Sequence, residues 1–175
     1  MIVKAEDLMS LPEFKSMDVK QLQQKLDALE ILIRQYTNNN FQNRHIRFKA
    51  ESLGDRIKGC HPFIKVGDTL QISESLVNDG LYVVREITDD GFIRVDKELY
   101  PVDKNLVTKI VYPLDIQQGI IDLMKWEVKN RDKVGIKSET LSRHSVTYFD
   151  LDVNQVRGYP VSLLGFLESY KKARF

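Results

Sequence analysis

The spacing of apolar residues changes twice along this chain, and the change limits the folds open to it. Between Val19 and Tyr36, apolar side chains recur every three or four residues, which predicts an amphipathic helix. From residue 62 to residue 111 they alternate with polar side chains, which predicts short strands. Helical spacing returns at Asp115. A purely helical fold and a purely β fold are both excluded.

Local signals mark both ends of the first long helix. Asp18 is a suitable N-cap, and Gln21 follows three residues later as its capping-box partner. A run of asparagines at residues 38–40 ends the apolar stripe and the helix. A shorter helix is expected over residues 3–9, because Pro12 disfavours helical backbone before it.

The middle of the chain predicts an inserted antiparallel β domain. Two turn sequences, at residues 78–80 and 89–91, end in a glycine that accepts positive φ. Strand-like segments lie at residues 69–73, 81–87, 92–95 and 106–111. Four or five short strands at this spacing are typical of a small barrel or sandwich. The basic segment 41–59 before them is read as extended and half-buried, with a solvated strand or loop as the alternative.

The last third of the chain predicts a helix, an arm and a closing helix. Ile116, Ile120, Leu123 and Met124 share one face of the helix that begins at Asp115. Gly119 and Trp126 lie together on a flank of that face. Because a glycine inside a helix costs about 1 kcal/mol against alanine, a close neighbour is expected at Gly119.

The predicted fold class is therefore α+β. It comprises a small helical bundle (residues 1–61 and 112–175) and an inserted antiparallel β domain, barrel- or sandwich-like (62–111). An extended β arm at about 136–150 follows, with strands at 136–140 and 145–148, and a C-terminal helix at about 160–173 in which Pro160 occupies the first turn.

Composition excludes several classes of protein. Lys and Arg total 26 and Asp and Glu total 25, so the net charge of +1 gives no argument for nucleic-acid binding. The single cysteine, Cys60, excludes an intramolecular disulfide and a cysteine-based zinc site. No apolar stretch approaches about 18 residues and no signal peptide is evident, so we expect a soluble, non-secreted protein without membrane contact.

Sequence motifs for chemistry are absent. His45, His61 and His144 stand in three unlike contexts, without the spacing of a metal site. No phosphate-binding glycine loop, dinucleotide fingerprint or nucleophile elbow occurs. Asp150 and Asp152 bracket Leu151, and nothing singles them out as a catalytic pair. We therefore predict no catalytic, cofactor-binding or metal-binding residues, and no enzyme activity.

The arm and the closing helix point to interaction instead. An arm and an amphipathic helix with a basic tip bury little surface by themselves, so a partner surface is expected to cover them. If the closing helix binds a partner, deleting residues 161–175 should leave the rest folded. The alternative is that arm and helix fold back onto the same chain.

The C-terminal region resembles the head–tail connector (adaptor, or head-completion) proteins of long-tailed bacteriophages. The family carries an arm of the form K-S-E-x-x-G-D-x-S-V-x-Y, then a G-Y-P sequence before a closing helix. Ser142 and Arg143 stand where Gly-Asp is frequent in the family. The β insertion of some members resembles residues 66–82 here. The matching residues are Lys137, Ser138, Glu139, Ser145, Val146, Tyr148, Gly158, Tyr159 and Pro160.

The resemblance implies a virion protein at the head–tail interface, assembled in the host cytoplasm. Such proteins form a homo-oligomeric ring, typically a dodecamer, that contacts the portal protein and the stopper or tail-completion protein. Genomic DNA passes through the lumen without sequence-specific contacts. The implied portal-binding residues are Tyr159, Phe166, Leu167, Tyr170, Lys171, Lys172 and Arg174; those of the inter-subunit arm are Ile136, Ser138, Val146, Tyr148 and Trp126.

A second function remains open. Residues 62–111 could form an SH3-like or OB-like ligand site in a monomeric cytosolic binding module.

Overall fold

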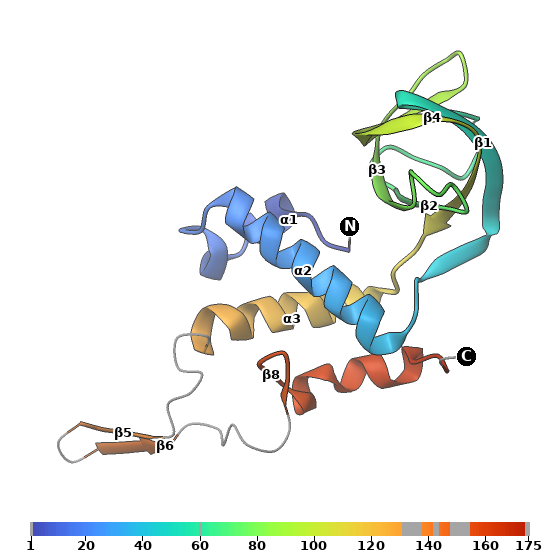
Figure 1. Cartoon of the computed structure of the whole chain (residues 1–175). Helices are drawn as coiled ribbons and strands as arrows, with labels where there is room; N and C mark the ends of the chain where they lie inside the picture. Colours follow the sequence, from blue (N-terminus) through green and yellow to red (C-terminus); the bar gives the residue numbers. More distant parts are fainter. Residues whose placement is uncertain (1, 60, 131–137, 142–143, 148–154, 174–175) are drawn as a thin grey trace. The chain divides into compact units, whose positions relative to one another are not determined.

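The computed structural model describes residues 2–59, 61–130, 138–141, 144–147 and 155–173 (Figure 1). The chain forms two compact units. We call residues 2–38 and 113–175 the helical unit, and residues 39–112 the β unit. Helices and a four-stranded antiparallel sheet make up the fold, so the predicted α+β class is confirmed.

The helical unit is organised around its longest helix. In it, Asp18 caps the N-terminus as predicted, since its carboxylate accepts a hydrogen bond from the backbone N of Gln21 at 3.0 Å. Asn38 ends the helix in the left-handed conformation. This helix, α2, packs with α1, α3 and η3. The elements are α1 (Ala5–Met9), η1 (Pro12–Phe14), α2 (Val19–Thr37), α3 (Leu114–Asn130) and η3 (Val161–Tyr170).

Two short hairpins separate α3 from η3. Strands β5 (Ser138–Leu141) and β6 (His144–Thr147) pair antiparallel, where the sequence predicted the two strands of an arm. Strands β7 (Gln155–Val156) and β8 (Tyr159–Pro160) pair in the same way. Arg157 and Gly158 between them have φ values of 52° and 84°. Positive φ at both central residues matches the right-handed twist of a two-residue hairpin.

The closing helix differs from its prediction. The sequence predicted an amphipathic C-terminal helix at about 160–173, whereas η3 is a 3-10 helix. With three residues per turn, side chains three apart share a face. Leu164 and Leu167 accordingly form its buried face, while Leu163, Phe166 and Tyr170 are half-buried.

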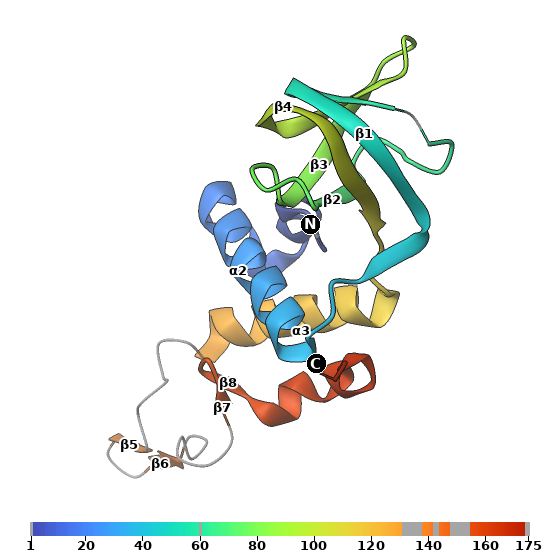
Figure 2. The ribbon, with the colours of Figure 1, turned by 45° about the vertical axis from the view of Figure 1, so that its right-hand side comes forward.

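The β unit consists of four strands in which β4 is the common partner. Figure 2 shows β1 and β4 running beside each other. The C-terminal part of β4 also pairs with β2, its N-terminal part pairs with β3, and β2 and β3 form a hairpin. Thus β4 bends around that hairpin. The strands are β1 (Gln42–Lys58), β2 (Thr69–Ser73), β3 (Gly80–Ile87) and β4 (Phe92–Ile110).

The sequence predicted two strands where the structure has the single strand β4. Pro101 lies within β4, and a proline normally argues against a strand interior. It is tolerated because the register with β1 shifts nearby: Ser52 faces Val102, whereas Gly54 faces Leu99. Such an irregularity takes up the extra residue and bends the strand.

The β unit begins earlier than the predicted insertion. The sequence placed its start at residue 62, whereas the unit starts at residue 39 and includes β1. The difference arises because β1 pairs with β4, which lies far along the chain. The residue pattern of 41–59 gives no sign of this pairing. At the ends of the unit, the backbone N of Val111 donates to the carbonyl of Phe41 at 3.0 Å. The chain therefore enters and leaves the unit at adjacent points.

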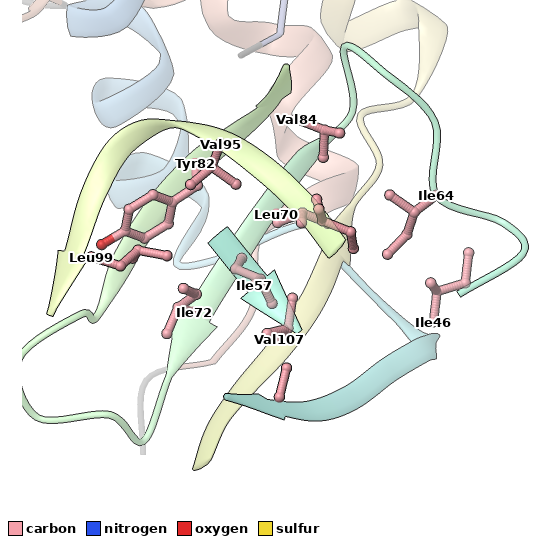
Figure 3. Packing of buried hydrophobic residues seen from close by; sticks show 12 residues of the cluster. Ile46, Ile57, Ile64, Leu70, Ile72, Tyr82, Val84, Val95, Leu99 and Val107 are labelled. Carbon is pink, nitrogen blue, oxygen red and sulfur yellow. The ribbon is translucent and has the colours of Figure 1, made fainter. Parts of the chain in front are cut away.

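The β unit has an apolar core of its own (Figure 3). All four strands contribute buried side chains, and Ile64 adds one from the connection between β1 and β2. An independent core is what a unit with adjacent ends needs in order to fold by itself. Its members are Ile46, Ala50, Ile57, Ile64, Leu70, Ile72, Tyr82, Val84, Ile93, Val95, Leu99 and Val107.

Candidate interaction surface of the helical unit

Tyr159, at the start of the closing segment, belongs to a polar cluster that joins three elements. Its buried hydroxyl donates to Oε2 of Glu127 on α3 at 2.7 Å. Nζ of Lys25 on α2 donates to Oε1 of the same carboxylate at 2.7 Å. Glu127 is only 6% exposed, and a buried carboxylate needs such partners to offset its lost hydration. The cluster therefore fixes β8 against α2 and α3.

A pocket opens beside this cluster. It has a volume of about 270 Å³. Ala28, Leu29 and Leu32 of α2 provide apolar lining, and Arg157 adds a cation next to Lys25. The volume is smaller than the roughly 300–1,000 Å³ of pockets that take drug-sized molecules. The pocket can receive side chains of a protein partner rather than a large cofactor.

Trp126 is half-buried in the helical unit and packs on Tyr159. The two ring centroids are 5.6 Å apart and the planes are tilted by 51°. That geometry is the favourable tilted arrangement of aromatic pairs. Part of the indole thus already has a partner within a single chain.

The close neighbour expected at Gly119 is Phe166 of η3. A Cβ atom added at Gly119 would lie 2.3 Å from Cζ of Phe166, far inside van der Waals contact. Glycine at this position is what allows the ring of Phe166 to rest on α3. Phe166, expected to anchor the chain to a partner, anchors η3 to its own helical unit.

A polar clasp holds the C-terminal end of η3. The hydroxyl of Tyr36 on α2 donates to Oε1 of Glu168 at 2.8 Å, and Nζ of Lys171 donates to the same oxygen at 2.8 Å. Nζ of Lys171 also lies 4.2 Å from the centre of the Tyr36 ring. The hydrogen bond from Lys171, followed by that from Tyr36, lowers the pKa of Glu168, and the bond to Glu168 raises the pKa of Lys171.

Two further contacts complete the clasp. The hydroxyl of Tyr170 lies 2.8 Å from each carboxylate oxygen of Asp115, and this hydrogen bond raises the pKa of Tyr170. The backbone N of Lys172 donates to the carbonyl of Thr37 at 2.8 Å. The Lys172 side chain is exposed, so its charge faces solvent.

The predicted portal-binding residues thus divide into two groups. Tyr159, Phe166, Leu167 and Tyr170 pack or bond within the helical unit. Lys171 and Lys172 are exposed at its tip, where Lys171 also bonds to Glu168. Arg174 lies outside the described residues. Because Leu164 and Leu167 are fully buried, removing residues 161–175 should unfold the helical unit. The packing of η3 thus favours the alternative in which the closing helix folds back onto the same chain.

The predicted arm residues are less fully described. Ile136 and Tyr148 lie outside the described residues. For Ser138 and Val146 the strand pairing alone is described: Ser138 pairs with Thr147, and Glu139 pairs with Val146.

The sequence did not single out the partners that fix the closing segment, namely Lys25, Tyr36, Asp115, Glu127 and Glu168. A signal existed for Glu127. It follows Leu123 by four residues and so continues the apolar face of α3, where a carboxylate implies a buried partner. Asp115 and Glu168 occupy exposed positions and give no such signal, whereas Lys25 and Tyr36 are half-buried.

The described residues contain no group of three or more His, Cys, Asp or Glu side chains arranged to hold a metal ion. Among the same residues, no helix is long and apolar enough to cross a membrane. No protein-family model matches the chain, and no curated protein matches it.

Proposed function

We propose that this chain is a structural protein of the bacteriophage neck, a head–tail connector. In this role it forms a ring beneath the portal, extends the DNA channel and joins the capsid to the stopper or tail. It catalyses no reaction and binds no cofactor. It enters the virion at the head–tail interface after assembly in the host cytoplasm.

The main support for the proposal is the position of the motif residues in the fold. Among the described residues that match the connector motif, Ser138, Glu139, Ser145 and Val146 lie on β5 and β6. Gly158, Tyr159 and Pro160 form the turn and the second strand of the β7–β8 hairpin, directly before the closing helix η3. The order of elements is also that of the proposed family: helices, a β insertion, a helix, a two-stranded arm and a closing helix. This order supports the arm as the contact to a neighbouring subunit.

The packing of η3 on its own unit limits which part of this segment the portal could contact. Phe166 and Leu167 hold η3 on its own unit, so the portal would meet the outward face and the basic tip of the docked segment. Lys171 and Lys172 are exposed there. Exposed cations steer a protein toward an acidic surface and raise the association rate in a salt-dependent way.

Co-sedimentation with portal-bearing capsids tests this contact. Lys172→Glu reverses an exposed charge, and among the described residues the Lys172 side chain has no hydrogen bond or ion pair, so the variant should fold normally and bind capsids more weakly at low salt. Lys20→Glu on α2 is the matched control, because Lys20 is also exposed. Equal loss in both variants, or no loss in either, would place the portal contact elsewhere on the chain.

A monomeric binding module is the second candidate. It is favoured by the separate apolar core of the β unit, which an SH3-like or OB-like ligand-binding domain would need. Size-exclusion chromatography with light scattering, followed by capsid sedimentation, separates the two functions. A chain that stays monomeric and never sediments with portal-bearing capsids supports the binding module.

A further inference from the structure

The loop between β2 and β3 presents two apolar side chains to solvent. Leu76 is 96% exposed and Val77 is 56% exposed. Leu76 has a φ of 68° and Glu74 a φ of 61°, a region that bulky non-glycine residues rarely adopt. Such backbone strain persists only where the surroundings impose it, and it gathers at functional sites. We call residues 74–79 the tip loop.

A buried polar network holds the tip loop in place. Nδ2 of Asn78 donates to Oγ of Ser52 at 3.0 Å and to the carbonyl of Tyr100 at 2.9 Å. Oδ1 of Asn78 accepts from the backbone N of Tyr100 at 2.8 Å. Asn105 donates to the same Ser52 hydroxyl at 2.9 Å. Because Ser52, Asn78 and Asn105 are all buried, the loop is preorganised and loses little entropy on binding.

The same β unit carries a small pocket whose apolar walls and charged rim could receive the tip loop. Its volume is about 190 Å³, which suits one or two aliphatic side chains. Leu53 and Phe92 supply apolar walls, and Arg56 and Lys58 outnumber Glu51 among its charged residues. The pocket is therefore apolar, and its rim carries the exposed cations of Arg56 and Lys58, which lie 3.9 Å from Asp55 and 3.5 Å from Glu51 of their own chain.

We propose that the tip loop of one copy inserts Leu76 and Val77 into this pocket of the next copy. The exposed carboxylates of Glu74 and Asp79 flank the apolar tip, so they would face the cations of Arg56 and Lys58. Leu76 is 96% exposed and does not line the pocket of its own chain, so tip and pocket stay available to neighbours.

The geometry of this contact is head-to-tail. Tip and pocket are different surfaces of one unit, so each copy can contact one neighbour through its tip and another through its pocket. Contacts of this kind close into a ring when the rotation between copies permits it. The inference adds a contact between subunits to the proposed neck ring. The inference rests on the proposed function only where it places this ring in the virion.

Directed disulfide formation tests the contact in the full chain. All variants carry Cys60→Ser, which removes the natural cysteine. Chains with Leu76→Cys, mixed under mild oxidation with an equal amount of chains carrying Leu53→Cys, should form more mixed dimer than random pairing of the two cysteines gives. Val66→Cys replaces Leu76→Cys in the control, because Val66 is an exposed apolar residue outside tip and pocket. Homodimers alone, or equal yields with the control, would overturn the inference.

A chain with both cysteines tests the geometry. Head-to-tail contact predicts a ladder of cross-linked oligomers. A product that stops at the dimer would show reciprocal pairing and would contradict a ring built from this contact.

Loss of self-association in single variants, and its rescue in a mixture of charge-reversed variants, provide a second test. Leu76→Ser should raise the self-dissociation constant, measured by sedimentation velocity, by roughly ten- to a hundredfold, as expected for a leucine that becomes exposed. Val66→Ser should leave it unchanged. Glu74→Lys and Arg56→Glu should each weaken association, and a mixture of the two variants should restore it. A wild-type chain that remains monomeric at the highest soluble concentration contradicts the inference.

Failure of this inference and failure of the proposed function have different signatures. If the inference alone is wrong, Leu76→Ser assembles on portal-bearing capsids like the wild type. If the neck function alone is wrong, cross-linking succeeds while the wild type does not sediment with those capsids.

Discussion

Replacing Gly119 by alanine should destabilise the helical unit, although alanine is the better helix former. The added Cβ would lie 2.3, 2.4 and 2.7 Å from three atoms of the Phe166 ring. Favourable contacts between carbon atoms begin near 3.5 Å, so the ring must retreat by about 1 Å or more. Phe166 belongs to the segment that covers α3, so its displacement disturbs the docking of η3.

The magnitude follows from two opposed effects. Overpacking of this kind typically costs about 1–3 kcal/mol. Replacing glycine in a helix interior returns about 1 kcal/mol through backbone entropy. Alanine at position 119 should therefore lower the free energy of unfolding by up to about 2 kcal/mol.

Fluorescence of Trp126, the chain's single tryptophan, provides the assay because Trp126 lies on the same helix. Denaturant unfolding is compared for the wild type, Gly119→Ala, Phe166→Ala and the double variant. Once Phe166 is truncated the clash is gone, so Gly119→Ala should stabilise the Phe166→Ala background. A Gly119→Ala variant more stable than the wild type, or one with the same effect in both backgrounds, would refute this packing.

Three further results are expected. Replacing residues 42–110 with a short Gly/Ser linker should leave a helical circular dichroism spectrum and a cooperative melt, because the ends of the β unit are adjacent. The bond to Asp115 raises the pKa of Tyr170, so its stabilisation is present below the ordinary value of 10.0 and is lost as pH rises through the raised one. Tyr170→Phe should therefore flatten the alkaline decline of the unfolding midpoint. Asn78→Ala should destabilise the β unit by about 2–3 kcal/mol in thermal or denaturant unfolding, since it removes the hydrogen bonds that the Asn78 amide makes with Ser52 and Tyr100.

Local structure could be predicted from the sequence where residues within one segment determine it. The N-cap at Asp18, the strand 69–73 and the close neighbour of Gly119 all follow from signals within a few residues. Each depends on backbone geometry or on helix periodicity, which a sequence displays directly.

Long-range pairing was not readable. The segment 41–59 was predicted to be extended, and it forms β1, but the sequence did not indicate that β4 is its partner. The continuity of β4 past Pro101 depends in turn on its shifted register with β1. The identity of the residue facing Gly119 likewise required the fold. From the sequence, Phe166 was predicted to contact a partner, whereas in the structure it lies on α3. An amphipathic stripe indicates that a face is buried but does not indicate which element covers it.

Stoichiometric binding to capsids tests the neck assignment most directly. Purified chain is titrated onto portal-bearing capsids and onto otherwise identical capsids without portal, and the bound copies per capsid are counted after sedimentation. A connector should bind the portal-bearing capsids alone and saturate at the copy number of one ring. Equal binding to both kinds of capsid, or binding to neither, would contradict the assignment.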